Sequence, residues 1–204
     1  MLILYLFIAA AACALSAALL EFIRSLGSGR QVAILVLFAG AYGALFLLSI
    51  ESFWLINLAV LLLGAAIGSP LSRAVGSKAA LWAFLISASV IDLLSFSGGL
   101  TRQIIEAAER GNPAILSFLT ISLSIEGGTH YILGIGDLAI FGAVYLALRT
   151  LGRSPAVAIS WPLLGLSAAI IWGSFVGGIS AIPFIAVVTL AGLAITDRQN
   201  INSG

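Results

Sequence analysis

The sequence predicts an all-α membrane protein, a polytopic bundle of about seven transmembrane helices. Of its 204 residues, 61% are hydrophobic and 8% are charged, whereas soluble domains are about half apolar and about a quarter charged. The mean hydropathy is +1.19. Seven stretches are each apolar over about the 20 residues that a helix needs to cross the hydrocarbon of a bilayer. We therefore expect a single integral membrane domain over residues 1–204, with the lipid bilayer as its immediate partner.

The first four apolar stretches fill the N-terminal half of the chain. The first ends near Glu21, and its apolar run of about 19 residues is long enough to span a bilayer rather than to be cleaved as a signal peptide. Glu51 marks a very tight turn after the second stretch, and Pro70 closes the third. Small residues recur at the spacing of close helix contacts in lipid, at Gly40 and Gly43, Gly64 and Gly68, and Gly173 and Gly177. The four expected helices are 2–23, 32–50, 52–69 and 79–97.

The long connection that follows, 98–129, is expected to lie at the membrane surface. Within 100–110, isoleucines lie on one helical face and charges on the other, the pattern of an amphipathic surface helix. A Gly-Asn-Pro sequence breaks this helix at 111–113. The apolar segment 114–125 is too short to span, so it would lie at the interface or re-enter the protein interior. Beside catalytic groups, such a segment is a candidate lid or substrate gate.

The C-terminal part supplies the last three expected helices, 130–149, 155–175 and 179–196. With seven spans, the loops after the first, third and fifth helices share a side with the C-terminus. The opposite side holds only Arg102 and Arg110 as basic residues. Since basic loops stay in the cytoplasm, we expect the N-terminus outside, the C-terminus in the cytoplasm and the long connection outside. The basic residues of the cytoplasmic side are Arg24, Arg30, Arg73, Lys78, Arg149, Arg153 and Arg198.

Two carboxylates interrupt the apolar stretches. Asp92 lies in the fourth expected helix and Asp137 in the fifth, at similar depths from the same membrane face. A charge near the bilayer centre costs about 2.5–3.5 kcal/mol on the milder insertion scales, and such residues mark functional sites. Gly134 and Gly136 remove side-chain bulk beside Asp137, so that a substrate strand or the facing helix could approach closely. We therefore expect the two acids to meet within the membrane.

Two such acids would form a proton-sharing dyad, because carboxyl groups about 3 Å apart in a low dielectric cannot both ionise. One would stay protonated and polarise a peptide carbonyl, while the other would take a proton from the attacking water. The roles stay unassigned, because a coupled pair titrates as a unit. For Asp137 the alternative is a structural acid capped by backbone or paired with a cation. Arg149, more than three turns further along the same expected helix, is a poor partner.

Several other classes of function find no support in the composition. The net charge is +1, so nothing indicates nucleic-acid binding. The single cysteine, Cys13, cannot form an internal disulfide and reads as a small core residue. No spacing typical of zinc or haem ligands occurs, so we expect neither a metal nor a cofactor. The oligomeric state and the need for partner subunits stay open.

An ordered set of motifs resembles the presenilin and signal peptide peptidase family of intramembrane aspartyl proteases. The Gly-Ile-Gly-Asp sequence at 134–137 matches the family's GxGD signature, and Asp92 matches its other catalytic aspartate. Residues 99–116 look like the presenilin stretch after that aspartate, and the family's PAL motif would fall on 180–183. The resemblance covers about residues 50–196 and implies a presenilin-like core. It implies Asp92 and Asp137 as catalytic residues, and Gly134, Gly136, Ala181, Ile182 and Pro183 as substrate-binding residues.

The chain also departs from that family's pattern. Ile91 stands where a tyrosine often precedes the first aspartate, and Ser180 and Ile182 replace the proline and leucine of PAL. Seven expected spans compare with nine in the family, so two N-terminal helices would be missing. Type IV prepilin peptidases share GxGD, but they typically have a basic residue where Ala139 stands here.

The expected function is that of an intramembrane aspartic endopeptidase acting on transmembrane or signal-peptide-like segments. A substrate helix would unwind locally, and Pro183 and segment 114–125 are the expected parts that receive the unwound strand. One alternative is a small transporter or ion-coupled carrier with buried acids, which would favour inverted repeats that the sequence does not display. The other is an inactive GxGD-like scaffold that binds membrane helices.

Overall fold

The computed structural model describes residues 1–26, 28–48, 52–125, 128–176 and 180–202. Helices make up most of these residues, as predicted, and one pair of strands joins them. The elements are α1 (Leu2–Ser25), α2 (Ser28–Leu47), α3 (Phe53–Arg73), α4 (Lys78–Gly98), α5 (Leu100–Glu109), α6 (Ala114–Leu119), β1 (Thr120–Ile125), β2 (Gly128–Gly134), α7 (Ile135–Thr150), α8 (Pro155–Val176) and α9 (Ile182–Asn202).

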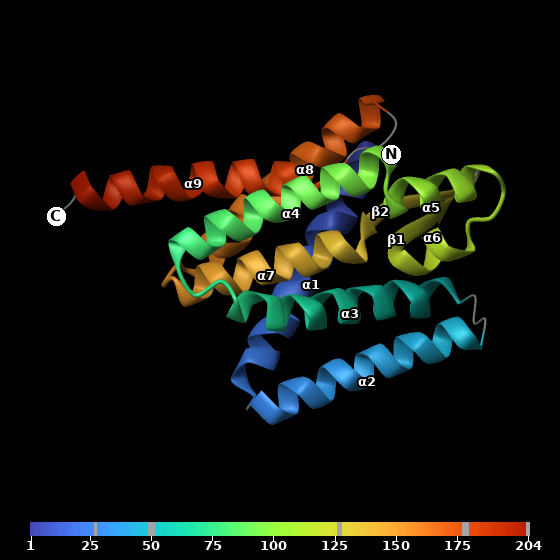
Figure 1. The fold of residues 1–204 in the computed structure, drawn as a ribbon, viewed down its shortest axis with the longest axis horizontal. Coiled ribbons are helices and arrows are strands. Elements are labelled where there is room, and N and C mark those ends of the chain that lie inside the picture. Colours follow the sequence, from blue (N-terminus) through green and yellow to red (C-terminus); the bar gives the residue numbers. More distant parts are fainter. Residues whose placement is uncertain (27, 49–51, 126–127, 177–179, 203–204) are drawn as a thin grey trace.

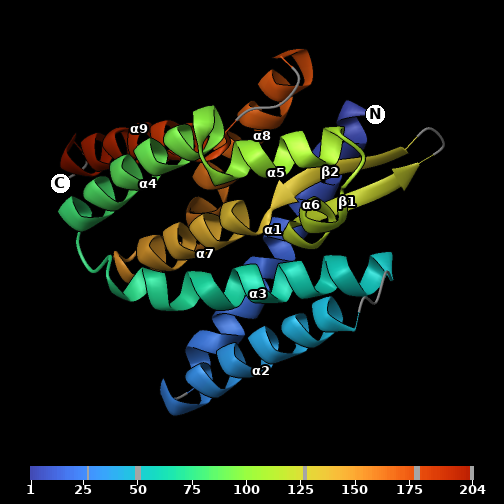
Figure 2. The same cartoon turned by 45° about the vertical axis from the view of Figure 1, so that its right-hand side comes forward.

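The long helices run in alternating directions between two ends of the molecule (Figure 1). α3 and α7 lie side by side at the centre, and α2 packs mainly against the outer side of α3. α4 and α9 pack together on the other side of α7, and α1 crosses behind α3 and α7. Helices α5 and α6 and the two strands gather at the end where α4 stops and α7 starts. Figure 2 shows the strand pair extending beyond the helices at that end.

Five helical segments have the length and apolar composition of membrane spans, which supports an integral membrane protein. Four of the seven expected spans, α1, α2, α3 and α8, meet both conditions, and α4 meets them together with α5 as Lys78–Glu109. The apolar part of α9, Ile182–Asp197, is shorter, and α7 has only 16 residues. The expectation of seven spans is therefore met by length and composition for five.

The predicted start of the fifth helix at residue 130 is wrong. Gly128–Gly134 is strand β2, which pairs antiparallel with β1, and α7 starts only at Ile135. A short apolar run such as Tyr131-Ile-Leu fits a helix or a strand equally well by hydrophobicity. Its aromatic and β-branched side chains favour the strand, and the second half of segment 114–125 supplies the partner strand.

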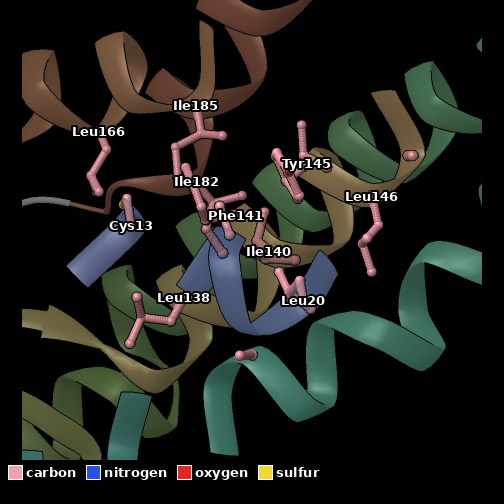
Figure 3. Packing of buried hydrophobic residues seen from close by; sticks show 14 of the residues in the cluster. Cys13, Leu20, Leu138, Ile140, Phe141, Tyr145, Leu146, Leu166, Ile182 and Ile185 are labelled. Carbon is pink, nitrogen blue, oxygen red and sulfur yellow. The ribbon is translucent and has the colours of Figure 1, made fainter. Parts of the chain in front are cut away.

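Helix α7 forms the centre of the core. Every residue from Leu138 to Leu148 is buried, as expected of a helix that is apolar on all sides. Figure 3 shows Phe141 of α7 in a cluster with side chains of α1 and α9. The predicted close helix contact is confirmed at Gly64 and Gly68. It is not found at Gly40 and Gly43, where a Cβ would meet no atom within 4 Å, and Gly177 lies outside the described residues. A Cβ at Gly64 would lie 2.7 Å from Cβ of Leu138, and one at Gly68 would lie 2.8 Å from the Ala139 carbonyl oxygen.

The end of the molecule opposite the strands is held by ion pairs. Arg149 Nε donates to Oε1 of Glu21 at 2.6 Å, which links α7 to α1. Lys78 Nζ lies 2.7 Å from Oδ2 of Asp197, and Arg153 pairs with the other oxygen of that carboxylate. Three of the basic residues expected on one side of the membrane, Lys78, Arg149 and Arg153, therefore lie at one end of the bundle.

Candidate active site

One cavity of about 300 Å³ brings the two membrane aspartates together. Asp92 reaches it from α4 and Asp137 reaches it from the start of α7. Its wall is completed by α5, α6, both strands and the residues that lead into α9. Two acids far apart in the sequence therefore line one cavity, and their sharing of a proton stays a prediction.

Asp137 lies at the junction of a strand and a helix rather than well inside a helix. It is the third residue of α7, and its Oδ2 accepts a hydrogen bond from the Gly134 N–H at 2.9 Å. A carboxylate in the first helical turn is favoured there, because it interacts with unpaired backbone N–H groups and the helix dipole. This is the backbone cap expected for a structural acid, but the same side chain also borders open space. In the described residues Asp137 has no ion-pair partner.

A second cavity, of about 330 Å³, reaches Asp137 from the other side. Tyr5 of α1, Tyr131 of β2 and Ser174 of α8 supply polar groups to its wall. Asp137 therefore lies between two cavities, one shared with Asp92 and one bordered by α1 and α8. Water entering either space would reach its carboxyl group.

Asp92 is held by the segment that leads into α9. Its Oδ2 accepts hydrogen bonds from the Ser180 hydroxyl and, at 3.3 Å, from the Ile182 N–H. Asp92 also borders an apolar cavity of about 450 Å³ between α4 and α7, whose wall includes Phe84 and Ile140. One side of this carboxyl group is thus fixed by protein donors, and the group lies where an apolar groove meets the shared cavity.

The two glycines of the GxGD sequence act differently. A Cβ on Gly136 would meet no atom within 4 Å, and Gly136 borders both the shared cavity and the apolar groove. A Cβ on Gly134 would lie 3.2 Å from Oδ2 of Asp137, which is close enough to crowd the carboxylate. Gly136 therefore keeps space open, whereas Gly134 allows the backbone to cap the acid.

The residues expected to bind substrate near α9 are only partly at the cavity. Ala181 and Ile182 line it, but Pro183 does not. Pro183 lies in the first turn of α9, where a proline is tolerated because its missing N–H would be unpaired in any case. Its place in the fold is the start of α9, and its predicted part in receiving the unwound strand stays a prediction. Leu116, Leu119 and Thr120 of segment 114–125 do line the cavity.

The predicted amphipathic helix is present as α5 and covers the shared cavity. Ile104 and Ile105 line the cavity from its apolar face. On its outer face Arg102 Nε donates to Oε1 of Glu106 at 2.8 Å, one turn along the helix. The apolar side of α5 thus closes the space above the two acids, while its charged side points away.

The sequence interpretation missed the anchor that holds strand β1. The Asn57 side-chain amide of α3 donates to the Ser122 carbonyl oxygen and accepts from the Ser122 N–H, both at 2.9 Å. This pair of bonds imitates a neighbouring strand. A lone asparagine in an apolar helix is costly unless paired, so Asn57 was the signal that could have indicated a backbone partner.

The chemistry of the cavity is that of carboxyl groups. No group of three or more histidine, cysteine, aspartate or glutamate side chains able to hold a metal occurs in the described residues. No family model matches the chain, and no similar protein is found among curated proteins or solved structures.

Proposed function

We propose that this protein is an intramembrane aspartic endopeptidase of the presenilin and signal peptide peptidase type. The observation that supports this most is the shared cavity of about 300 Å³, which Asp92 and Asp137 enter from different helices. Two carboxyl groups that line one cavity within an apolar helical protein are the minimum that general acid–base hydrolysis of a peptide bond needs.

In the proposed reaction, one carboxyl group is protonated and donates to the carbonyl oxygen of the scissile bond. The other is ionised and removes a proton from a water molecule, whose oxygen attacks the carbonyl carbon. The proton then passes to the leaving nitrogen as the C–N bond breaks. The pair titrates as one unit, so neither role is assigned to one of the two aspartates.

The strand pair offers a way to hold an unwound substrate. At Ser122 the outer side of β1 is taken by Asn57. In the described residues, the backbone of 128–133 makes hydrogen bonds with no element other than β1. An extended peptide can add to a free strand edge through backbone hydrogen bonds. A substrate strand added to β2 would run toward Asp137, because β2 leads directly into α7.

The apolar groove between α4 and α7 is the proposed entrance for the substrate. Its wall is almost wholly apolar, with Asp92 at its inner end. An apolar substrate segment in the bilayer would gain nothing by exposing a peptide bond to lipid, so unwinding is favoured only beside the polar cavity. The substrates are therefore transmembrane or signal-peptide-like segments.

For the membrane orientation, we propose that the strand pair and α5 lie outside and the ion-paired end lies in the cytoplasm. The gathering of Arg73, Lys78, Arg149 and Arg153 at one end supports this, because basic residues favour the cytoplasmic side. Impermeant thiol reagents should label a cysteine at Asn112 in intact cells, and one at Gly76 only after permeabilisation.

The decisive experiment compares the chain's three aspartates. Purified protein in lipid is mixed with a model transmembrane peptide, with and without an aspartyl-protease transition-state analogue. Asp92→Asn and Asp137→Asn should each lower cleavage by at least about a hundredfold, because each removes a general acid or base. Asp197→Asn is the matched control, because Asp197 pairs with Lys78 and Arg153 at the opposite end.

Cleavage that survives in either dyad variant would overturn the proposal. Peptide binding without cleavage in the unsubstituted protein would favour a scaffold for membrane helices. Ion or solute uptake into liposomes that depends on Asp92 and Asp137 would favour a carrier instead.

A further inference from the structure

The Ser180 hydroxyl is the side-chain donor nearest to a catalytic carboxyl group. Ser180 is only 5% exposed, and its hydroxyl donates to Oδ2 of Asp92. A buried hydroxyl without a hydrogen-bond partner destabilises the fold, so the contact with Asp92 stabilises this orientation of the Ser180 side chain. Ser180 lies far from Asp92 in the sequence and reaches it from the segment before α9.

The same oxygen of Asp92 accepts a second donor from this segment. The Ile182 N–H points at Oδ2 at 3.3 Å, and Ile182 is the first residue of the 21-residue helix α9. The carboxyl group therefore also faces the positive end of a helix dipole. In the described residues no hydrogen bond reaches Oδ1. One oxygen of Asp92 is thus fixed, which leaves the other for water or substrate.

We infer that Ser180 is a positioning residue for Asp92, which orients its carboxyl group and follows its proton during the reaction. This inference rests on the proposed function. A hydroxyl can donate to an ionised carboxylate, and after rotation it can accept from a protonated one. Ser180 can therefore satisfy Asp92 in both protonation states. A proline at this position, as in the PAL motif that the segment resembles, has no donor to offer.

The two acids differ in the donors that hold their carboxyl groups. Asp137 is held by one backbone donor, the Gly134 N–H, which cannot accept a proton-bearing partner in return. Asp92 has a side-chain donor that can reverse its direction in addition to a backbone donor. The Ser180 contact thus distinguishes Asp92 as the acid whose surroundings adapt when its proton moves.

The first test replaces the hydroxyl and measures turnover. Ser180→Ala should lower kcat by about tenfold to a hundredfold, the effect of losing one hydrogen bond to a charged group. KM should change by less than about twofold, because the Ser180 hydroxyl is engaged by Asp92 rather than by the substrate. Ser180→Thr keeps the hydroxyl and should restore most of the rate. Ser160→Ala is the control, since the Ser160 hydroxyl bonds to its own helix at Ala156.

The second test reads the contact without using cleavage. The protein is labelled with carbon-13 at the aspartate carboxyl groups and its NMR spectrum is recorded. In the Asp197→Asn variant only Asp92 and Asp137 then give carboxyl signals. The Asp92 signal, assigned by its loss in Asp92→Asn, should move in Ser180→Ala and stay in place in Ser180→Thr. If the alanine variant folds poorly, Ser180→Cys keeps the shape with a weak donor and should move the same signal.

The two tests distinguish the proposed protease function from the proposed role of Ser180. If the unsubstituted protein cleaves no peptide, the proposed protease function is contradicted, while the Asp92 signal still shows whether Ser180 holds the carboxyl group. An unchanged kcat in Ser180→Ala would overturn the inference even if the protein is a protease. An Asp92 signal that stays in place in Ser180→Ala would overturn the inference as well.

Discussion

Gly136 is the residue at which one side chain can fill the candidate active site without disturbing the helices around it. The space that its Cβ would occupy is empty within 4 Å and belongs to the shared cavity. Because the proposed hydrolysis needs this volume for water and for a peptide bond, the free space of the site depends on a single position.

Gly136→Leu should therefore leave the fold intact and lower peptide cleavage by at least about tenfold, because the side chain enters the cavity rather than the core. The measurements are the thermal unfolding midpoint and the rate of cleavage of a model transmembrane peptide. Gly40→Leu is the matched control, since Gly40 is also helical and also has no atom within 4 Å of its missing Cβ. Equal loss of activity in both variants would contradict this assignment.

Individual residues also show which parts of the candidate site could be predicted from the sequence alone. The placing of Asp92 and Asp137 at one cavity could be predicted, because a carboxylate in an apolar stretch has few structural reasons to be there. Ser180 and Asn57 could not be assigned. A hydroxyl or amide is informative only once its partner is placed, and both partners lie far away in the sequence. The departure of Ser180 from PAL was visible, but its contact with Asp92 was not.

Among the elements, the strand pair is the part that hydrophobicity could not predict. Apart from the start of α7 and the end of α9, the long helices agree with their expected ranges within a few residues, because about 20 apolar residues admit one solution in a bilayer. The short apolar runs that form β1 and β2 are compatible with more than one secondary structure. Their pairing depends on Asn57 and on the helices beneath them, which are contacts that a local pattern does not contain.

The link between α3 and β1 depends on one amide. Asn57→Leu removes both hydrogen bonds to Ser122 and leaves its N–H and carbonyl group unpaired, which should cost about 1–3 kcal/mol of unfolding free energy. We expect faster amide hydrogen exchange in Thr120–Ile125 and slower peptide cleavage, because β2 loses its ordered partner. Asn112→Leu, in the exposed turn after α5, is the control. Unchanged exchange in β1 would show that the amide is not its anchor.

For the whole molecule, the ion-paired end contrasts with the end that holds the two acids. Lys78 and Arg153 connect the starts of α4 and α8 to Asp197 at the polar end of α9. The hydrogen bond from Lys78, followed by that from Arg153, holds the pKa of Asp197 below its ordinary value. This cluster ties three helices together away from the cavity, so its titration should affect stability and not catalysis.

The pKa direction fixes the sign of the pH dependence. Because the pKa of Asp197 is lower in the folded state than in the unfolded state, its contribution is present above the unfolded pKa of about 3.9 and is lost as the pH falls through the folded value. At neutral pH, Asp197→Asn should reduce the unfolding free energy by about 1 kcal/mol or less, since the pair is partly exposed. The difference from the unsubstituted protein should shrink below about pH 4. Chemical unfolding in detergent at several pH values measures it, and a difference that grows on acidification would contradict the pairing.

The direct passage of β2 into α7, with no linker before Asp137, has a consequence for selectivity. A peptide that docks along β2 in the wrong register would displace the backbone whose N–H group caps Asp137. If the proposed function holds, poorly matched peptides should therefore bind almost as readily as well-matched ones and yet be cleaved slowly. Discrimination would then be expressed in turnover rather than in occupancy.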